Sequence, residues 1–205
     1  MIWIDGQLVS PVKDGVQGER TLQGFRLWDP RRSKLSALYH LGMGRELEPQ
    51  HRVLYLGAAN GTTVSHIADY VEVVYAVESA SRPFQDLIVV AERRENIIPI
   101  MADARKPHLY RPLVEEVDII YQDIAQRDQA DILLSNTGFL KSGGTTVLML
   151  KARSVDVRRT LSEIAVETET ILKGGGLSIE KVLSLSPYYP DHAAVLGKRP
   201  RQTAE

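Results

Sequence analysis

Hydrophobic residues after position 50 fall into short apolar runs, separated by segments in which apolar residues recur at helical spacing. The runs predict strands over 53–57, 71–78, 96–103, 117–123 and 145–151. The helical spacing predicts helices over 64–71, 84–92, 130–139 and 157–172. Strands that alternate with helices of about ten residues are typical of crossover units, so we expect an α/β fold with a mostly parallel sheet.

Two further apolar runs, 177–185 and 192–197, follow a glycine triplet at 174–176. Their short connection, SPYYPD, favours an antiparallel hairpin at the edge of the sheet. Before the last parallel strand, Gly143 and Gly144 predict a turn.

The first fifty residues have a different pattern. Asp5-Gly6 lies between short apolar runs, which is typical of a β-hairpin. Asp29 and Pro30 then predict the start of a helix, with Asp29 as its cap, and Gly42 predicts its end. We therefore expect a small β-rich lobe with a helix over 1–50, a main domain over 51–197 and a loose tail over 198–205.

Composition narrows the class of protein. The chain has 205 residues, of which 25% are charged and 43% hydrophobic, and a formal net charge of −1. This globular composition lacks the basic excess of many nucleic-acid-binding proteins, so any RNA binding must rest on local patches. The absence of cysteine excludes disulfides and thiolate metal sites, and we expect no metal. No membrane span or signal-peptide pattern is evident, so we expect a cytoplasmic protein.

The stretch VLYLGAANGTT, residues 53–63, joins the first strand of the main domain to a helix. In doubly wound sheets, ligands bind at the carboxyl ends of the strands, where this turn lies. Gly57 and Gly61 lack the G-x-G-x-x-G spacing that brings backbone close to a pyrophosphate, which favours a nucleoside ligand without a diphosphate. Thr62 and Thr63 offer hydroxyl and backbone N–H groups to a carboxylate. The alternative interpretation is an ordinary strand-to-helix turn.

Two acidic residues end the next two predicted strands. Glu78 lies about twenty residues past Gly57, where a carboxylate accepts hydrogen bonds from ribose hydroxyls. At Asp103 a carboxylate can accept from an adenine amino group, with the backbone of Ala104 near the base. Each residue alone is also compatible with a solvated charge at a strand end. Together they indicate a ligand with a carboxylate, a ribose and an adenine but no phosphate, which is S-adenosylmethionine.

Several stretches resemble the fibrillarin family of RNA 2'-O-methyltransferases, which work in box C/D ribonucleoproteins. They are LYLGAANGTTVSHIADYV, VYAVE, NIIPIMADARKPHLYR, VDIIYQDIAQRDQADILLSN and FLKSGGTTVLMLKARSVD. The likeness extends upstream to RLWDPRRSKLSAL and downstream to PYYPDHAAVLG, and the chain begins with the folded lobe, as in archaeal members. The resemblance implies a Rossmann-like methyltransferase fold with S-adenosylmethionine as the methyl donor.

The resemblance also implies a cofactor site built from the glycine-containing turn and the strand ends. The expected cofactor-binding residues are Gly57, Ala58, Gly61, Thr62, Thr63, Glu78, Ser79, Asp103, Ala104, Asp123, Ile124, Ala125 and Gln126. An aromatic residue often follows the strand-two glutamate in the family where this chain has Ser79, which leaves the stacking partner of the adenine open.

Methyl transfer to a ribose hydroxyl is an in-line displacement that needs orientation of the reactants and removal of the hydroxyl proton. Asp123 and Lys151 end strands beside the expected sulfonium, and the resemblance adds Lys34 and His192 to a catalytic set. We expect Lys151 to act on the hydroxyl as base or electrostatic stabiliser, and Asp123 to orient that lysine. Lys34 and His192 would hold the ribose. The alternatives are solvated charges and, for His192, a turn or core histidine.

The expected RNA-binding residues, in two basic clusters, are Arg31, Arg32, Lys106, His108 and Arg111. Such clusters bind phosphates without reading sequence, although either cluster is also compatible with a solvated surface. The resemblance implies that a box C/D guide RNA pairs with the rRNA target. A Nop-type scaffold protein and a kink-turn-binding protein would hold the enzyme in place, so we expect little methylation by the isolated chain.

Three other functions share part of this pattern. A nicotinamide-dependent dehydrogenase would need tighter glycine spacing and a phosphate contact. A methyltransferase acting on protein or a small molecule would share every cofactor residue. A non-catalytic scaffold subunit that kept the fold would tolerate loss of Lys151 and Asp123.

Overall fold

The structure is a computed structural model that describes residues 1–11, 15–16 and 18–201. In this part of the chain, seven strands form a larger sheet in the order β10-β11-β9-β8-β5-β6-β7. Their bounds are Arg52–Leu56 (β5), Val73–Glu78 (β6), Ile97–Met101 (β7), Val117–Gln122 (β8), Leu140–Lys151 (β9), Ser178–Leu185 (β10) and Tyr189–Lys198 (β11). A smaller antiparallel sheet, ordered β1-β2-β4-β3, consists of Ile2–Ile4 (β1), Gln7–Ser10 (β2), Thr21–Leu22 (β3) and Phe25–Leu27 (β4).

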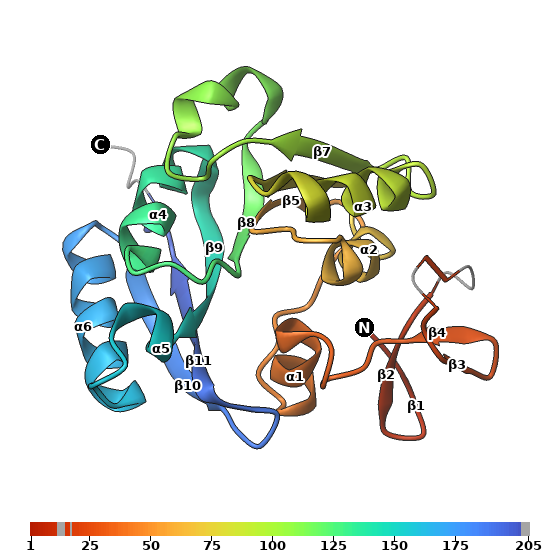
Figure 1. The fold of residues 1–205 in the computed structure, drawn as a ribbon, viewed down its shortest axis with the longest axis horizontal. Helices are drawn as coiled ribbons and strands as arrows, with labels where there is room; N and C mark the ends of the chain where they lie inside the picture. The colour runs from red at the N-terminus through yellow and green to blue at the C-terminus, as the bar shows by residue number, and fades with distance from the viewer. Residues whose placement is uncertain (12–14, 17, 202–205) are drawn as a thin grey trace.

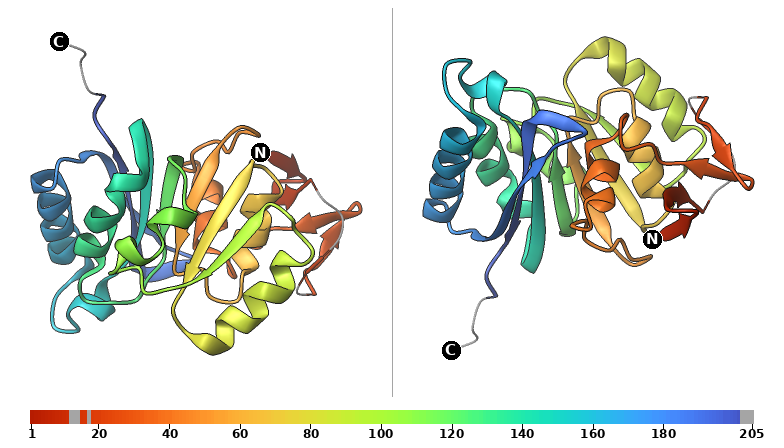
Figure 2. Two further views of the ribbon diagram at one scale, coloured as in Figure 1. Left: turned by 90° about the horizontal axis from the view of Figure 1, so that it is seen from above. Right: turned by 90° about the horizontal axis from the view of Figure 1, so that it is seen from below.

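Helices cover both faces of the larger sheet (Figures 1 and 2). One face carries Lys34–His40 (α1), Thr62–Ala68 (α2) and Ser81–Ala91 (α3), and the other carries Gln129–Asn136 (α4), Ala152–Val155 (α5) and Leu161–Gly174 (α6). Short 3-10 turns lie at Pro107–Leu109 (η1), Arg111–Leu113 (η2) and Thr137–Phe139 (η3). Among the described residues, no helix is long and apolar enough to cross a membrane.

Successive strand residues supply two separate cores, because neighbouring side chains of a strand point to opposite faces. In β5, Val53 and Tyr55 pack with the residues of α1, α2 and α3, whereas Leu54 and Leu56 pack with those of α4 and α6. The expected α/β fold with a mostly parallel sheet is confirmed. The antiparallel hairpin of β10 and β11 stands at its edge, also as expected.

The order of strands in the larger sheet reverses between β5 and β8. Strand β5 pairs in parallel with β6 on one side and with β8 on the other. Gly57 and Asp123 are the first residues after β5 and β8, and the Asp123 N–H donates to the Leu56 carbonyl at 2.9 Å. A ligand site is expected at such a point, where the two crossovers diverge and leave a crevice.

The smaller sheet begins with the predicted hairpin. Ile4 pairs with Gln7, and the two residues between them, Asp5 and Gly6, have φ values of 49° and 72°. Positive φ at both central residues is the type I' turn that Asp-Gly favours. Sequence chemistry and backbone conformation therefore agree here.

Helix α1 begins later than predicted. The sequence pattern indicated Asp29 as the cap, but Ser33 is the cap, and its hydroxyl accepts the N–H of Ser36. Asp29 instead closes a turn before the helix, where its carbonyl accepts the N–H groups of Arg32 and Ser33. The predicted end is confirmed, since Gly42 adopts the left-handed conformation with a φ of 73°.

The predicted turn at Gly143 and Gly144 is wrong. Both glycines lie within β9, which starts at Leu140, and the register with β8 shifts beside them. A Cβ at Gly144 would lie 3.0 Å from the carbonyl oxygen of Asp118. Glycine therefore lets the strand bulge against its neighbour, which the dipeptide alone does not distinguish from a turn.

Two further differences lie near the carboxyl terminus. Helix α6 begins at Leu161 rather than at 157, because Thr160 and Glu163 form a capping box. Beyond β11, the backbone of Arg199 bonds to Gly143 and Gly144. Residues 202–205 of the expected tail lie outside the described residues.

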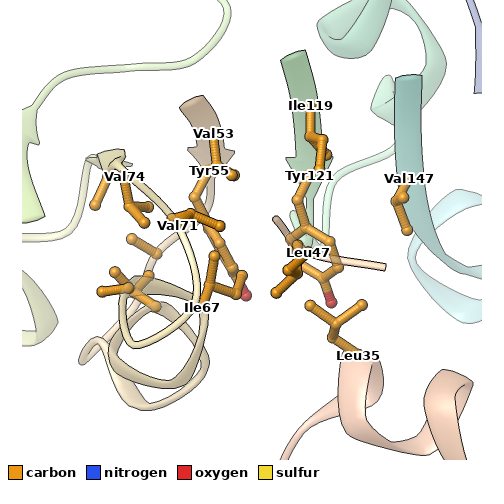
Figure 3. Packing of buried hydrophobic residues seen from close by; sticks show 14 of the residues in the cluster. Leu35, Leu47, Val53, Tyr55, Ile67, Val71, Val74, Ile119, Tyr121 and Val147 are labelled. Atoms are coloured by element: carbon orange, nitrogen blue, oxygen red, sulfur yellow. The ribbon is translucent and has the colours of Figure 1, made fainter. Parts of the chain in front are cut away.

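Tyr55 and Tyr121 belong to the core through which α1 packs on the larger sheet. Tyr121 points from β8 toward Leu35 of α1, and Tyr55 points from β5 toward Ile67 of α2, with ring centroids 4.6 Å apart (Figure 3). Burial raises the pKa of both hydroxyls well above the usual value, so both side chains stay neutral. Packing on these rings brings the first residue of α1, Lys34, to the carboxyl ends of the strands.

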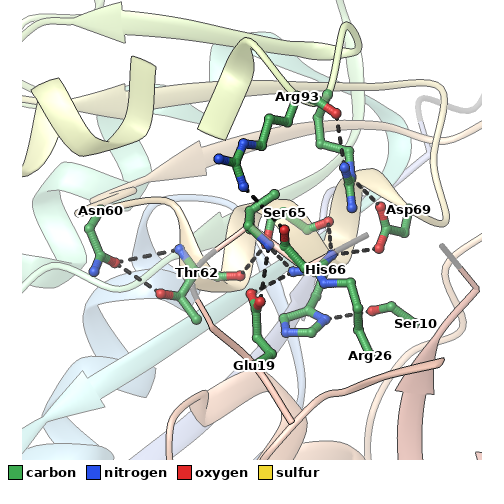
Figure 4. A network of polar contacts seen from close by, with 12 residues as sticks. Ser10, Glu19, Arg26, Asn60, Thr62, Ser65, His66, Asp69 and Arg93 are labelled. Atoms are coloured by element: carbon green, nitrogen blue, oxygen red, sulfur yellow. Dashed lines mark hydrogen bonds and ion pairs between the residues drawn. The ribbon is translucent and has the colours of Figure 1, made fainter. Parts of the chain in front are cut away.

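A buried ion network joins the smaller sheet to α2. Arg26 in β4 is 0% exposed and binds the carboxylates of Glu19 at 2.8 Å and Asp69 at 2.7 Å (Figure 4). Arg94 binds the other oxygen of Asp69 at 2.7 Å. Burial, with the nearby Arg26 cation, lowers the pKa of His66 to about 3, so its ring is neutral in this network. The smaller sheet is thus anchored to α2 by buried ion pairs.

We expect Arg26→Met to reduce the free energy of unfolding by about 3–5 kcal/mol, because it removes the cation from two buried carboxylates. Urea denaturation measures this loss. Arg20→Met is the matched control, since the Arg20 side chain is 78% exposed and its ion pair to Asp29 is 3.8 Å long. The control should change stability by no more than about 0.5 kcal/mol. Similar losses in the two variants would contradict the role given to Arg26.

Candidate active site

A cavity of about 310 Å³ opens at the carboxyl ends of β5, β6, β7 and β8. The turns after these strands form it, so residues far apart in sequence meet there. Of the expected cofactor-binding residues, those that line it are Gly57, Glu78, Ser79, Asp103, Ala104, Asp123, Ile124, Ala125 and Gln126. The sequence analysis missed other lining residues, namely Ala59, Val77, Ala80, Ala102, Arg105 and Ile132. Most of these are small or apolar residues next to an expected one, and they carry no chemical signal of their own.

Gly57 allows two turns to touch. Its φ is +83°, and a Cβ would lie 2.6 Å from the carbonyl oxygen of Asp123. Glycine is required by both the left-handed backbone and the close approach. The turn after β5 therefore packs directly on the loop after β8.

Glu78 is fixed at the cavity by two backbone groups. One carboxylate oxygen accepts the N–H of Ala59 at 2.9 Å, and the other accepts the N–H of Ala80 at 2.7 Å. A carboxylate has lone pairs for about four hydrogen bonds, so capacity remains for a ligand. Glu78 is thereby oriented to accept hydrogen bonds from ribose hydroxyls.

Asp103 is engaged by a neighbouring arginine. Its Oδ1 accepts from the backbone N–H and the Nε of Arg105, both at 3.0 Å. These hydrogen bonds hold the pKa of Asp103 below its usual range, so the group is an acceptor at neutral pH. The sequence analysis missed Arg105, although an arginine two residues after a strand-end aspartate is a usable signal.

The other expected cofactor residues, Ala58, Gly61, Thr62 and Thr63, do not line this cavity. The Thr63 hydroxyl donates to Ser33 Oγ at 3.1 Å, which ties α2 to the cap of α1. Thr62 lines a separate cavity of about 210 Å³ together with Arg32 and Ser33. The first turn of α2 thus faces the smaller sheet and α1 as well as the glycine-containing turn.

Lys34 and Asp123 form an ion pair at the edge of the cavity. Lys34 Nζ lies 2.8 Å from both carboxylate oxygens of Asp123, although the residues are 89 positions apart. We expected Asp123 to orient Lys151, but its carboxylate binds Lys34 instead. Since Asp123 also lines the cavity, it connects the cavity to the residues around Lys34.

Lys151 and His192 stand opposite each other on β9 and β11. Burial lowers the pKa of His192, and the charges of Lys34 and Lys151 lower it further, against the opposing effect of Asp123. The four expected catalytic residues are therefore close enough to influence one another. Tyr189, which the sequence analysis missed, has its ring 5.6 Å from Lys34 Nζ and 5.6 Å from the His192 ring.

Two buried glutamines lie behind this cluster and were not expected. Gln122 is 0% exposed and donates to the carbonyl of Gln129 at 2.7 Å. Gln129 is 1% exposed and bonds to the backbone of Lys151 and Gln126. A glutamine at the end of an apolar run was a signal for Gln122, whereas nothing in the local pattern indicates Gln129.

The first expected RNA-binding cluster lies beside the site. Arg31 and Arg32 are exposed in the turn that leads into α1, directly before Ser33 and Lys34. The carboxylate of Asp29 shapes this turn by accepting the Arg31 N–H at 2.8 Å. Both residues therefore lie within three positions of Lys34 along the chain, where Arg31 lines one cavity with His40 and Arg32 lines another with Thr62.

In the second expected cluster, Lys106 directly follows the cavity-lining Arg105, whereas Arg111 lies far from Lys151. Lys106 and His108 are exposed after β7, and the Arg111 guanidinium lies over the ring of Phe139, 5.4 Å from its centroid. Phe139 directly precedes β9, whereas Lys151 ends it. A strand of this length spans on the order of 35 Å, so Arg111 lies near the opposite end of β9 from Lys151.

The arrangement suits group transfer between a nucleoside and a hydroxyl. A cavity with two oriented carboxylates adjoins a cluster that contains two lysines, a neutral imidazole and a shared carboxylate. Such a cluster can position an acceptor and take up its proton. Within the described ranges, no group of three His, Cys, Asp or Glu side chains could hold a metal ion.

The chain matches known proteins along nearly all of its length. Residues 12–201 match the family model Fibrillarin. The fibrillarin-like rRNA/tRNA 2'-O-methyltransferase of Methanoculleus marisnigri is 60% identical over 97% of this chain and 99% of that protein. A solved fibrillarin in complex with Nop5p is similar with a TM-score of 0.90 and 43% identity, over 96% of this chain and 95% of that one. Aeropyrum pernix fibrillarin, solved with natively bound S-adenosyl-L-methionine, has a TM-score of 0.81 and 40% identity, over 93% and 86% of the two chains.

We expect Lys34→Met to raise the pKa of His192 toward the ordinary histidine value. The substitution removes a positive charge that lowers this pKa and frees the Asp123 carboxylate, which raises it, so both effects have the same sign. An NMR titration of the His192 ring measures the change. Lys173→Met, on α6 and paired with Glu169, is the control and should leave the titration unchanged. A His192 pKa that does not move in Lys34→Met would contradict the cluster.

Proposed function

The chain belongs to the fibrillarin family, and we propose that it transfers a methyl group from S-adenosylmethionine to the ribose 2'-hydroxyl of RNA. The proposed targets are nucleotides of rRNA, and of tRNA, that a guide RNA selects. The observation that carries the proposal is the double contact of Asp123, which lines the cavity and binds Lys34. It sets a nucleoside-sized cavity directly beside a cluster able to receive a hydroxyl.

The residues of the cavity fit S-adenosylmethionine. We assign the ribose hydroxyls to Glu78, whose carboxylate is fixed by two backbone N–H groups, and the adenine to Asp103 and Ala104. Ile124, Ala125 and Gln126 would complete the wall. The wide spacing of Gly57 and Gly61 supports a cofactor without a diphosphate. This donor supplies an electrophilic methyl group, so the protein must orient the acceptor and manage one proton.

The proton that must be removed is on the acceptor hydroxyl, and we assign its removal to the cluster beside the cavity. Lys151 would act on the hydroxyl, and Lys34, fixed by Asp123, would stabilise the negative charge that develops on oxygen. His192 has a lowered pKa and is therefore neutral at pH 7, so its ring can accept a hydrogen bond or a proton. Tyr189, whose ring contacts both Lys34 and His192, would shield the ribose from water.

The acceptor RNA would approach over the turn before α1. Exposed Arg31 and Arg32 lie there beside Lys34, which suits contacts to phosphates on either side of the modified nucleotide. Lys106 and His108 are exposed on the segment after β7, next to cavity-lining residues, and they and Arg111 would bind other phosphates. In this proposal, residues 1–50 frame the acceptor side and 51–197 carry the cofactor.

The assembly we propose is a box C/D ribonucleoprotein in the cytoplasm. A fibrillarin similar over 96% of this chain has been solved in complex with Nop5p, which supports a Nop-type scaffold as a direct partner. A kink-turn-binding protein would join through the guide RNA. Because none of the basic clusters resembles a base-reading module, the guide RNA would choose the nucleotide.

The test is transfer of labelled methyl from S-adenosylmethionine to guide-paired RNA in a particle reconstituted with both partner proteins. We expect label on one ribose 2'-oxygen and a fall of about 100-fold in kcat for Lys151→Ala, with cofactor affinity unchanged within about twofold. Lys141→Ala is the matched control, because Lys141 lies on the same strand but pairs with Asp118 at its other end.

Three results would contradict the proposal. Label on protein would make the chain a methyltransferase of another class. Full activity of Lys151→Ala would remove the proposed role of that residue. Efficient site-specific methylation by the isolated chain would remove the need for a guide RNA and a scaffold.

A further inference from the structure

The side-chain amide of Gln129 makes three hydrogen bonds to backbone. Its Oε1 accepts the N–H of Lys151 at 3.0 Å, and its Nε2 donates to the carbonyls of Lys151 at 3.3 Å and Gln126 at 2.7 Å. In this orientation the amide oxygen accepts from an N–H and the NH₂ group donates to two carbonyls, so every bond pairs a donor with an acceptor. The residue is 1% exposed, so water does not compete for these bonds.

The amide occupies the place of a missing strand neighbour. Strand β8 ends at Gln122, whose partner on β9 is Leu148, whereas β9 continues to Lys151. Beyond Gln122 the chain turns away to form the loop that lines the cofactor cavity. The side of β9 that β8 would cover is therefore open at Lys151, and Gln129 fills it with the donor and acceptor that a strand would supply.

The same bonds determine the type of cross-strand pair that Lys151 forms with His192. Both backbone polar groups of Lys151 are directed to Gln129, so Lys151 and His192 form a non-hydrogen-bonded pair across β9 and β11. In such pairs the Cα atoms lie closer and the side chains are in contact range. The Lys151 side chain is thus presented toward His192, which agrees with its effect on the His192 pKa.

The third bond reaches the loop that lines the cavity. Gln126 lines the cavity, and its carbonyl shares the Gln129 amide with the carbonyl of Lys151. One buried side chain thereby joins the cofactor loop to the backbone of the residue expected to act on the acceptor. The backbone carbonyl of Gln129 accepts a hydrogen bond from the side-chain amide of Gln122 at 2.7 Å.

We infer that Gln129 is a positioning residue for methyl transfer, which holds the backbone of Lys151 at a fixed place relative to His192 and the cofactor loop. It acts through Lys151 and touches neither substrate. The inference rests on the proposed function, because Lys151 has its role only there. A displacement of about 1 Å at such a group reduces the rate by up to about 100-fold, so we expect kcat to respond more than the binding of cofactor or RNA.

Two substitutions separate positioning from general stability. Gln129→Met has a similar size and loses all three bonds, so we expect kcat to fall between about 10-fold and 100-fold. Gln129→Glu keeps the acceptor for the Lys151 N–H but sets a carboxylate against two carbonyls. Burial raises the pKa of such a carboxyl, and its protonated form regains a donor. The activity of Gln129→Glu relative to wild type should therefore rise as the pH falls, whereas that of Gln129→Met should stay constant.

The control is Leu172→Ala, a cavity-forming change in α6 at a residue that is 0% exposed and takes no part in the hydrogen bonds of the Gln129 side chain. It should lower stability while leaving kcat and its pH profile unchanged at a temperature where all variants are folded. If Leu172→Ala and Gln129→Met lost activity in parallel with stability, or if neither Gln129 variant changed kcat, the inference would fail.

A readout independent of activity uses the isolated chain. In Gln129→Met we expect the Lys151 amide to lose protection from hydrogen exchange, while Val147 and Leu148 in β9 keep theirs. The His192 pKa should rise as the Lys151 charge moves away. An unchanged Lys151 amide and His192 titration would overturn the inference. If the wild-type particle failed to methylate RNA, the proposed function would fall, while these two measurements would still decide whether Gln129 holds Lys151.

Discussion

The ion pair between Lys34 and Asp123 is the contact on which the arrangement of the site depends. Asp123 leaves β8 at the point where the strand order reverses, with its N–H bonded to the Leu56 carbonyl and its own carbonyl packed against Gly57. Its carboxylate then holds Lys34 at 2.8 Å through both oxygens. Both side chains are about three-quarters buried, so solvent screens the pair less than it would on the surface. One residue thus connects the sheet, the cofactor cavity and α1.

The rest of the structure keeps α1 where this pair can form. Tyr55 and Tyr121 support the helix from the sheet, and the Thr63 hydroxyl binds its Ser33 cap. On the far side, the network around Arg26 anchors the smaller sheet to α2. The neutral, buried ring of His66 adds a stacking contact with Trp28, with centroids 5.0 Å apart. The acceptor side of the site is therefore built from a rigid frame.

Sequence patterns were sufficient for the parts of the structure that depend on local chemistry. The strands of the larger sheet follow from apolar runs, and Glu78, Asp103 and Asp123 were found because polar residues at strand ends share one edge of a parallel sheet. Local patterns failed where the same residue types are compatible with more than one local structure. Asp29 has the chemistry of a helix cap, but Ser33 caps α1, and Gly143-Gly144 has the composition of a turn but forms a bulge.

Long-range partners could not be read from the sequence. The sequence analysis paired Asp123 with Lys151, and only the packing of α1 against the sheet shows that its partner is Lys34. The role of Gln129 depends on where β8 ends relative to β9, which no local pattern records. The proposed roles of residues in methyl transfer likewise rest on the family resemblance and the geometry together.

The most direct test of the account is a double-mutant cycle of Lys34→Met and Asp123→Asn on methyl transfer by the reconstituted particle. If the two residues act as one unit, the double variant should have a kcat/KM within about twofold of the more impaired single variant, which corresponds to a strong coupling energy. Effects that multiply, so that the double variant loses the product of the two single losses, would contradict the central role of this ion pair.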